Sequence, residues 1–229
     1  MKLVCFDLGG VLVRICRSFG EACRAAGLDV RASIEGRVAQ RIRYEFSQRF
    51  NTGKLDELSW ANELSGALDG LYTADELRRV HRAWTLGEYE GAHELVHELD
   101  SIGVATACLS NTDQSHWTRL VHHDGTSALP GEPEYPSVLR LHHRHASHLF
   151  GFAKPNAEIY RAFEAATALR GPEILFFDDL PENVRGARDI GWRAERIDPY
   201  NETVPQLRRW LRHHGVLPRT AQELARSAR

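Results

Sequence analysis

The feature that most constrains this chain is a short apolar run that ends in a carboxylate followed by two glycines. Leu3–Phe6 has the composition of a buried β-strand, and Asp7–Gly10 follows it directly. The same design returns where Ile174–Phe177 runs into Asp178-Asp179. Open α/β sheets bind ligands at the carboxyl ends of their strands, so two such strands side by side would bring three carboxylates together. Carboxylates that close repel unless a cation or a proton lies between them, and such oxygen ligands suit Mg²⁺.

Composition bounds the size and the partners of the protein. The 229 residues allow one α/β domain with a small attached cap, or two compact domains. A formal net charge of -2, with 26% charged residues, favours neither nucleic acid nor an acidic membrane as a partner. No apolar run approaches the roughly 20 residues that span a bilayer, and the charge of Asp7 interrupts the one N-terminal run that resembles a signal peptide.

The cysteines indicate the compartment. None of the four belongs to a CxxC pair, and two lie in apolar or strand-like contexts, which suits reduced thiols in the cytoplasm better than a disulfide framework. They are Cys5, Cys16, Cys23 and Cys108.

The apolar pattern divides the chain into a core and two additions. From about Arg17 to Trp84 the spacing is helical without a convincing buried strand, which predicts an inserted helical cap. Beyond it, helices alternate with short apolar strands, as in a parallel α/β sheet. We therefore predict a core at 1–16 and 87–204, a cap at 17–86 and a C-terminal helical tail at 205–229.

Local signals place several elements more closely. Asp56 and the Thr73–Glu76 segment have the side chains of helix N-caps. A strand is expected at Val104–Leu109. The Gly, Pro and short polar residues from Val121 to Ser137 predict an exposed loop. In the tail, apolar residues at helical spacing predict packing on the core, and these are Leu207, Trp210 and Leu211.

Four polar clusters lie at or just after expected strand ends. They are Asp7, Ser110-Asn111, Lys154 and Asp178-Asp179. A carboxylate can attack phosphorus as a nucleophile when a metal and a cation neutralise the phosphoryl oxygens. In this interpretation Asp7 attacks, Ser110-Asn111 and nearby N–H groups hold phosphoryl oxygens, and Lys154 balances charge. Asp178 and Asp179 hold the metal.

The order of these motifs resembles that of a known superfamily. FDLGGVL, LSNT, AKP and FFDDLPEN are similar to motifs one to four of the haloacid dehalogenase (HAD) superfamily, over the chain from about Lys2 to Pro199. The chain resembles the helical-cap branch of that superfamily, which includes sugar-phosphate phosphatases and the N-terminal phosphatase domain of soluble epoxide hydrolases. The resemblance implies a Rossmann-like parallel sheet, a Mg²⁺ cofactor and a small phosphorylated substrate.

The resemblance also implies roles for individual residues. Asp7 is then the nucleophile, and the metal lies among Asp7, the backbone carbonyl of Gly9 and the carboxylate of Asp179. Asp178 is then either a second metal ligand or a residue that supports the ligands without touching the metal. Asn183 orients the loop that contains Asp178 and Asp179.

One position departs from the family pattern. Phosphatases of the superfamily usually have a second Asp two residues after the nucleophile, which protonates the leaving group and activates water, but this chain has Gly9 there. Loss of such acid–base catalysis typically costs about 10²- to 10⁴-fold in rate. Three interpretations follow. The protein is a phosphatase for good leaving groups such as anomeric sugar phosphates or acyl phosphates, or it recruits a proton donor from the cap or the substrate, or it is a non-catalytic phosphate-binding protein.

A rival chemistry shares the nucleophile. Removal of halide from a 2-haloacid also uses an Asp nucleophile, but it forms a carboxyl ester and needs no metal. The acidic pair Asp178-Asp179 argues against that chemistry.

Two further groups of side chains have ordinary interpretations. Seven of the twelve histidines lie mid-chain, without cysteines or carboxylates at ligand spacing, so we predict solvated or hydrogen-bonded histidines rather than a transition-metal site. They are His116, His122, His123, His142, His143, His145 and His148. The cap has polar and charged side chains that are candidates for binding a polar substrate, although such charges usually lie on solvated helix faces. Its tryptophans are expected to pack within the cap. The candidates are Arg14, Arg17, Arg43, Tyr44 and Arg49, and the tryptophans are Trp60 and Trp84.

Overall fold

A five-stranded parallel sheet forms the centre of the protein, in the strand order β5-β4-β1-β6-β7. The computed structural model describes residues 1–121 and 134–219. The strands are β1 (Leu3–Phe6), β4 (Ala105–Ser110), β5 (His143–Ala146), β6 (Ile174–Asp178) and β7 (Arg193–Arg196). After β1 the chain reaches β4 and β5 on one side and then returns to β6 and β7 on the other. The carboxyl end of β1 therefore lies at the switch point of the sheet, where such folds bind ligands.

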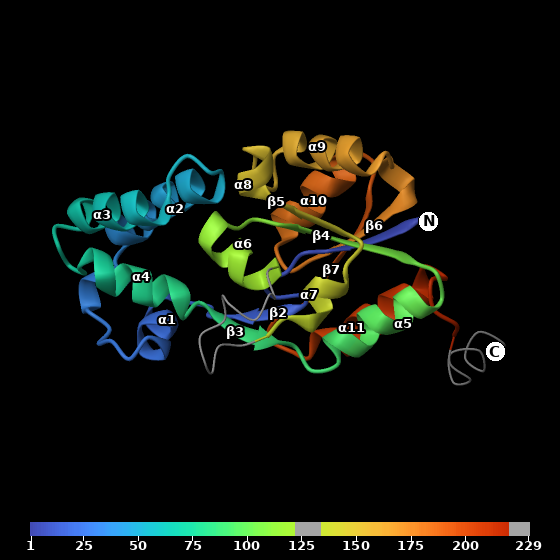
Figure 1. Ribbon diagram of the computed structural model, residues 1–229, viewed down its shortest axis with the longest axis horizontal. Helices are drawn as coiled ribbons and strands as arrows, with labels where there is room; N and C mark the ends of the chain where they lie inside the picture. Colours follow the sequence, from blue (N-terminus) through green and yellow to red (C-terminus); the bar gives the residue numbers. More distant parts are fainter. Residues whose placement is uncertain (122–133, 220–229) are drawn as a thin grey trace.

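Helices cover both faces of this sheet, as the predicted α/β class requires. Val4 and Phe6 belong to the apolar cluster on one face, with residues of α5 and α11, whereas Leu3 and Cys5 face α9 and α10 on the other. Figure 1 shows the two helix pairs on opposite sides. All four β1 side chains are fully buried, which explains a continuous apolar run. The helices are α5 (Ala92–Ser101), α9 (Ala157–Thr167), α10 (Pro181–Asp189) and α11 (Thr203–His213), and a short η2 (Gly171–Glu173) precedes β6.

A separate helical cluster is inserted between β1 and β4, and we call it the cap. It comprises α1 (Phe19–Ala25), η1 (Ala32–Glu35), α2 (Arg37–Asn51), α3 (Glu57–Ala67) and α4 (Ala74–Arg82). These helices bury an apolar core of their own, in which Leu64, Tyr72 and Leu77 are almost fully enclosed. Figure 1 places the cap beyond the carboxyl ends of the strands. The division at 16/17 and 86/87 stays a prediction.

The expected helix starts in the cap are confirmed. The Asp56 side chain accepts a hydrogen bond of 2.8 Å from the Ser59 N–H. Thr73 and Glu76 form a complete capping box at the start of α4. These caps satisfy backbone donors that the first helical turn leaves without a partner.

Thr73→Ala is expected to lower the free energy of unfolding by about 1 kcal/mol, because it removes the acceptor for the Glu76 N–H. Chemical denaturation measures this change. Ser101→Ala, at the exposed end of α5, is the control, since its hydroxyl bonds only a carbonyl of its own helix. Equal midpoints for the two variants would show that the capping box does not contribute.

Some parts of the fold differ from the predictions. A two-stranded antiparallel sheet of β2 (Val13–Ile15) and β3 (Thr85–Glu88) joins core and cap and was not predicted. The expected loop is wrong at its end, because Tyr135 and Ser137 are buried and α7 (Pro136–Arg140) begins there. The Ser137 N–H and hydroxyl both donate to Glu88, at 2.7 and 2.6 Å, so this short polar residue is satisfied inside the protein. The rest of the loop, at 122–133, lies outside the described residues.

The tail follows the prediction as far as it is described. Leu207 and Leu211 are fully buried in the core cluster, and α11 begins at Thr203, two residues before the predicted boundary. Residues 220–229 lie outside the described residues. Among the helices of 1–121 and 134–219, none has the length and apolar character needed to cross a bilayer.

Candidate active site

Three carboxylates meet at the carboxyl edge of the sheet because β1 and β6 are neighbours. Phe6 pairs with Phe177 in the parallel register, so the residues after each strand end side by side. Oxygens of Asp7, Asp178 and Asp179 lie within 4.8 Å of one another. Asp178 is fully buried, and Asp7 and Asp179 are only 7% and 6% exposed. This convergence is the arrangement that the two strand motifs predicted.

A buried lysine ties two of these carboxylates together. Lys154 Nζ lies 3.0 Å from Asp7 Oδ1 and 2.7 Å from Asp178 Oδ2, and the lysine side chain is completely enclosed. Burial works to lower the pKa of Lys154, but the two carboxylates outweigh it and raise the pKa well above its usual range. Lys154 is therefore a fixed positive charge behind Asp7.

Asp178 is anchored on all sides. Both of its oxygens accept from the Asn183 side-chain amide, at 3.0 and 3.1 Å, and Oδ1 also accepts from the Leu180 N–H. Burial raises the pKa of Asp178 to about 6, against the opposing effect of Lys154. Burial also raises the pKa of Asp7, again against Lys154.

The backbone of Lys154 is held by Asn111, the residue that follows β4. Asn111 Nδ2 donates to the Lys154 carbonyl at 2.9 Å, and the Lys154 N–H donates to Asn111 Oδ1 at 2.8 Å. Ser110, the last residue of β4, is 5% exposed. The predicted phosphate-binding roles of Ser110 and Asn111 stay predictions, and Asn111 has a visible part in fixing the Lys154 backbone.

Asp179 faces a cationic side chain, Arg17, from the segment just before α1. Arg17 Nη1 lies 2.9 Å from Asp179 Oδ2, and Arg17 also donates to the Tyr89 hydroxyl at 3.3 Å. Gly10 has a φ of +82°, and a Cβ there would lie 2.6 Å from Asp179 Oδ2. The second glycine of the motif is thus required both for the backbone turn and for the approach of this carboxylate.

The donor set fits a hard divalent cation. Three carboxylates face one point with Lys154 as the buried counter-charge, and every candidate ligand atom is oxygen. Asp7 and Asp179 offer carboxylates toward the cavity described next, whereas the oxygens of Asp178 are already engaged by Lys154 and Asn183.

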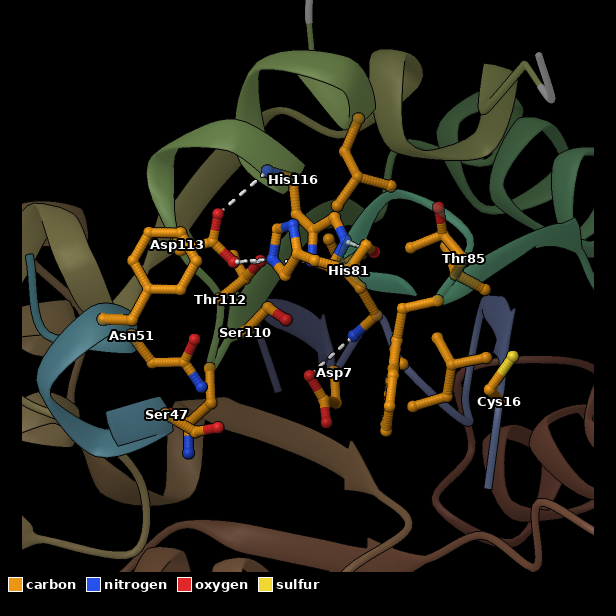
Figure 2. Close-up of a pocket in the computed structure, with 18 of the residues that line it drawn as sticks. Asp7, Cys16, Ser47, Asn51, His81, Thr85, Ser110, Thr112, Asp113 and His116 are labelled. Carbon is orange, nitrogen blue, oxygen red and sulfur yellow. Dashed lines mark hydrogen bonds and ion pairs between the residues drawn. The ribbon is translucent and has the colours of Figure 1, made fainter. Parts of the chain in front are cut away.

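A cavity of about 440 Å³ lies between the cap and this edge of the sheet. Figure 2 shows Asp7 and Ser110 on its core side, with His81 of α4 and Asn51 of α2 contributing from the cap. Of the predicted site residues, six line the cavity, namely Asp7, Gly9, Ser110, Asn111, Asp179 and Asn183. Lys154 and Asp178 lie behind them.

The cap candidates divide between the cavity and the surface. Arg17 and Arg43 line the cavity, whereas Tyr44 is exposed and Arg49 pairs with Glu63 at 2.9 Å. Arg14 is not among the lining residues. The expectation for the tryptophans is confirmed, because Trp60 and Trp84 belong to the apolar cluster of the cap, and both also reach the cavity.

Sequence reasoning missed a second polar group on the cavity wall, formed by His81, Asp113 and His116. The statement that no carboxylate stands near the histidines is wrong at His116, because Asp113 precedes it by three residues at the start of α6 (Gln114–Val121). The three-residue spacing of Asp113 and His116 was the available signal in the sequence. His81 lies on cap helix α4, so no local spacing points to it.

The predicted hydrogen-bonded histidines are confirmed at three positions. His142 Nδ1 accepts from the Thr106 N–H at 3.2 Å and lies 3.0 Å from the Thr106 hydroxyl. His116 Nε2 lies 2.7 Å from the His81 carbonyl, and His148 Nδ1, in α8 (Ser147–Phe150), lies 2.9 Å from the Thr112 carbonyl. His122 and His123 lie outside the described residues.

Comparison with known proteins gives a consistent picture. A family model described as haloacid dehalogenase-like hydrolase matches residues 1–191. The chain is 38% identical over 72 residues to Phosphatase MT3486 of Mycobacterium tuberculosis, an alignment that covers 31% of this chain and 33% of that protein. The chain thus matches about a third of the length of this curated relative.

Solved structures share the fold. The HAD family enzyme bt-2542 of Bacteroides thetaiotaomicron has a TM-score of 0.71 at 17% identity, over 90% of this chain and 98% of that one. The same enzyme is known in complex with magnesium and inorganic phosphate. L-2-haloacid dehalogenase from Xanthobacter autotrophicus has a TM-score of 0.57 at 21% identity, over 86% of this chain and 77% of that one.

Proposed function

The chain belongs to the haloacid dehalogenase-like hydrolases, whose family model matches residues 1–191, and on that premise we propose that it is a magnesium-dependent phosphatase. Its substrate is a small phosphomonoester of sugar-like character, and the reaction passes through an aspartyl-phosphate on Asp7. The relative named as a phosphatase and the neighbour solved with magnesium and phosphate support this choice.

One observation carries the proposal. Asp7, the candidate nucleophile, shares its corner of the cavity with a second carboxylate, Asp179, while Lys154 neutralises only the side of Asp7 and Asp178 that faces the core. Arg17 pairs with Asp179, so Lys154 and Arg17 together offset two of the three carboxylates and one negative charge remains. An anionic phosphoryl group that enters this site therefore requires a further cation. Metal-independent dehalogenation needs no second carboxylate beside the nucleophile, whereas metal-assisted phosphoryl transfer uses Asp179 as a metal ligand.

The surroundings of Asp7 select the attacking atom. Its Oδ1 accepts from the Leu8 N–H at 2.7 Å and lies 3.0 Å from Lys154 Nζ, so Oδ2 is the oxygen left for attack on phosphorus. Lys154 holds the carboxylate in orientation and keeps it ionised against the effect of burial. Asp178 and Asn183 in turn hold Lys154, and Asn111 fixes its backbone.

The remaining residues receive the phosphate and the metal. The Ser110 hydroxyl and nearby backbone N–H groups bind phosphoryl oxygens. Asp7, Asp179 and the Gly9 carbonyl hold Mg²⁺, with Asp178 supporting from behind through Lys154. When bound, Mg²⁺ neutralises charge on the phosphoryl oxygens and orients the phosphate.

The cavity fits a small substrate. A volume of about 440 Å³ is within the range of small-molecule sites, and its cap side combines Phe50 and Trp60 with the guanidinium of Arg43. This mixture of aromatic faces and a polar cation suits a sugar-like group.

The four cysteines are buried free thiols, which supports placement of the protein in the reducing cytoplasm.

Phosphate release is expected to require Mg²⁺, to stop with EDTA and to return when excess Mg²⁺ is added. Mg²⁺ alone is expected to raise the thermal midpoint, since a ligand that binds only the folded state at 100 times its Kd adds about 2.7 kcal/mol of stability. Phosphate release and differential scanning fluorimetry measure these effects on a panel of sugar phosphates, acyl phosphates and an activated aryl phosphate.

Asp179→Asn is the informative variant of this experiment, and Asp189→Asn, at the exposed end of α10, is its matched control. The first is expected to lose Mg²⁺-dependent stabilisation and activity, and the second to keep both. Turnover that persists in EDTA, or halide release from a 2-haloacid without metal, would contradict the proposal.

A further inference from the structure

His81 and Asp113 form an acid–base pair on the wall of the cavity that contains Asp7. Glycine at position 9 has no side chain to move a proton, so phosphate-ester cleavage here needs a donor from elsewhere. We propose that His81, oriented by Asp113, protonates the leaving group and then activates the hydrolytic water. This inference rests on the proposed phosphatase function and adds a catalytic residue supplied by the cap.

Hydrogen bonds fix the Asp113 carboxylate, so that it can hold the His81 imidazole in one orientation. Its Oδ1 accepts from the Ser115 N–H, the Ser115 hydroxyl and the His116 N–H, at 2.9, 2.7 and 3.1 Å. Its Oδ2 lies 2.9 Å from His81 Nε2. Although burial works to raise the pKa of Asp113, the neighbouring His81 and these donors hold it well below its usual range. A fixed carboxylate therefore faces His81.

His116 does not compete for that carboxylate. Burial lowers the pKa of His116 to about 3, so its ring is neutral and has a single N–H. Nε2 lies 2.7 Å from the His81 carbonyl, which can only accept, so Nε2 has the proton. Nδ1, 3.4 Å from Asp113 Oδ2, is left without a proton to donate. His116 thus fixes the His81 backbone and leaves Asp113 to the His81 ring.

The ring geometry favours proton transfer over a metal site. The imidazoles of His81 and His116 stack with centroids 3.7 Å apart and planes inclined by 14°. A metal binds a histidine in the plane of the ring, about 2.0–2.1 Å from the nitrogen for zinc. Two nearly parallel planes with that spacing share no such point. In this arrangement, the two imidazoles and Asp113 therefore do not coordinate the same metal ion.

His81 is held where it can reach a bound ester. It lines the cavity with Asp7 and Ser110, and Figure 2 shows it between the Asp113 side and the Asp7 side of the pocket. Phe50 and Trp60 pack against its ring with centroids 5.2 Å away in each case. Within 1–121 and 134–219, its Nδ1 has no hydrogen-bond partner. Nε2 is thus occupied by Asp113, and Nδ1 is the nitrogen available for substrate.

The proton balance of the two steps is complete. As Asp7 Oδ2 bonds to phosphorus and the ester P–O bond breaks, the proton on His81 Nδ1 passes to the departing oxygen, which leaves as an alcohol. In the second step, water oxygen bonds to phosphorus and the Asp7 O–P bond breaks. The water proton passes to Nδ1, and inorganic phosphate leaves with the imidazolium restored. Asp113 stabilises the imidazolium before the first step and again after the second.

His81→Gln tests the assignment, because glutamine retains an N–H donor for Asp113 but cannot shuttle a proton. The measurement is kcat/KM for a sugar phosphate and for an activated aryl phosphate, since kcat/KM reports the steps up to the first irreversible loss of the leaving group. The expected loss is about 10²- to 10³-fold on the sugar phosphate, and under about 5-fold on the aryl phosphate, whose leaving group needs no proton.

Three companions complete the experiment. Asp113→Asn is expected to show the same substrate selectivity in a smaller degree, and His143→Gln, on edge strand β5 away from the cavity lining, is expected to change neither rate. Gly9→Asp in the His81→Gln background is expected to recover much of the sugar-phosphate rate. The tightest contact of a Cβ at residue 9 is the flexible end of the Ile15 side chain, at 3.0 Å. Thermal midpoints establish that each variant is folded.

Two results would overturn the assignment, and they differ in what else they overturn. An equal loss on both substrates in a folded His81→Gln protein would give His81 a structural role and leave the phosphatase proposal intact. Absence of Mg²⁺-dependent phosphate release from every substrate in the unmodified protein would overturn both.

Discussion

Asp7→Asn is expected to abolish phosphate release, with kcat/KM lowered by at least about 10⁴-fold on every substrate, as when the nucleophile of a covalent mechanism is removed. The amide is nearly the same shape as the carboxylate but is a poor nucleophile. It also leaves Lys154 with Asp178 as its one remaining carboxylate partner at hydrogen-bond distance among the described residues. The loss is expected even on an activated aryl phosphate, which distinguishes Asp7 from His81.

The control for this result is retention of the fold. Asp7→Asn is expected to unfold cooperatively and to keep a thermal midpoint near that of the unmodified protein, because Lys154 and Asp178 still form a pair at 2.7 Å. Asp189→Asn again controls for the loss of one negative charge. Residual activity within about tenfold of the unmodified enzyme would exclude Asp7 as the nucleophile.

Lys154→Met is expected to have the second-largest effect, because it removes the cation from between two carboxylates. Asp7 and Asp178 then face each other in an enclosed site without a counter-charge, and breaking a buried ion pair from one side costs about 3–5 kcal/mol. Activity is expected to fall with stability, since Asp7 loses the group that orients its Oδ1. Chemical denaturation and kcat/KM measure the two losses separately.

Two further substitutions show whether charge or bulk matters at that position. Lys154→Arg keeps the charge in a planar group that does not match the single point between the two carboxylates, so a partial loss is expected. Lys54→Met, at an exposed position after α2, is expected to leave the unfolding midpoint unchanged. A stable and active Lys154→Met protein would show that the carboxylates are not held by this ion pair.

The core of the site could be predicted because its residues follow strands with a strong apolar signal. Leu3–Phe6 and Ile174–Phe177 are fully buried on both faces of the sheet, so their composition identifies them and the position of Asp7 and Asp178 follows. Parallel pairing of neighbouring strands then brings the carboxylates together. To predict that the carboxylates meet, it is enough to know that β1 and β6 are neighbours in the sheet.

Other parts had no such signal. Strand β5 is His-Arg-His-Ala at the sheet edge, where Arg144 is exposed, the two histidines are half-buried and no apolar run marks the strand. β2 ends at Ile15 and β3 begins at Thr85, so 69 residues, including the whole cap, lie between the two strands. Antiparallel pairing at that separation depends on how the cap folds.

The His81–Asp113 contact could not be predicted for a related reason. The two residues are 32 positions apart, one on a cap helix and the other at the start of a core helix. The contact exists only because the cap packs over the edge of the sheet. Residue 9 indicated that a proton donor was missing, whereas the three-residue spacing of Asp113 and His116, a signal of a local pair, was overlooked. The identity of the donor came from tertiary structure alone.

The most direct test of the central claim is identification of a phosphoryl group on Asp7 during turnover. The protein is mixed with Mg²⁺ and substrate, quenched rapidly in acid, and the peptide that contains Asp7 is examined by mass spectrometry. We predict a phosphorylated Asp7 in the unmodified enzyme with Mg²⁺, none in EDTA, and none in Asp7→Asn. Turnover of the same substrate without any phosphoryl group on Asp7, or with the group on another residue, would contradict the account.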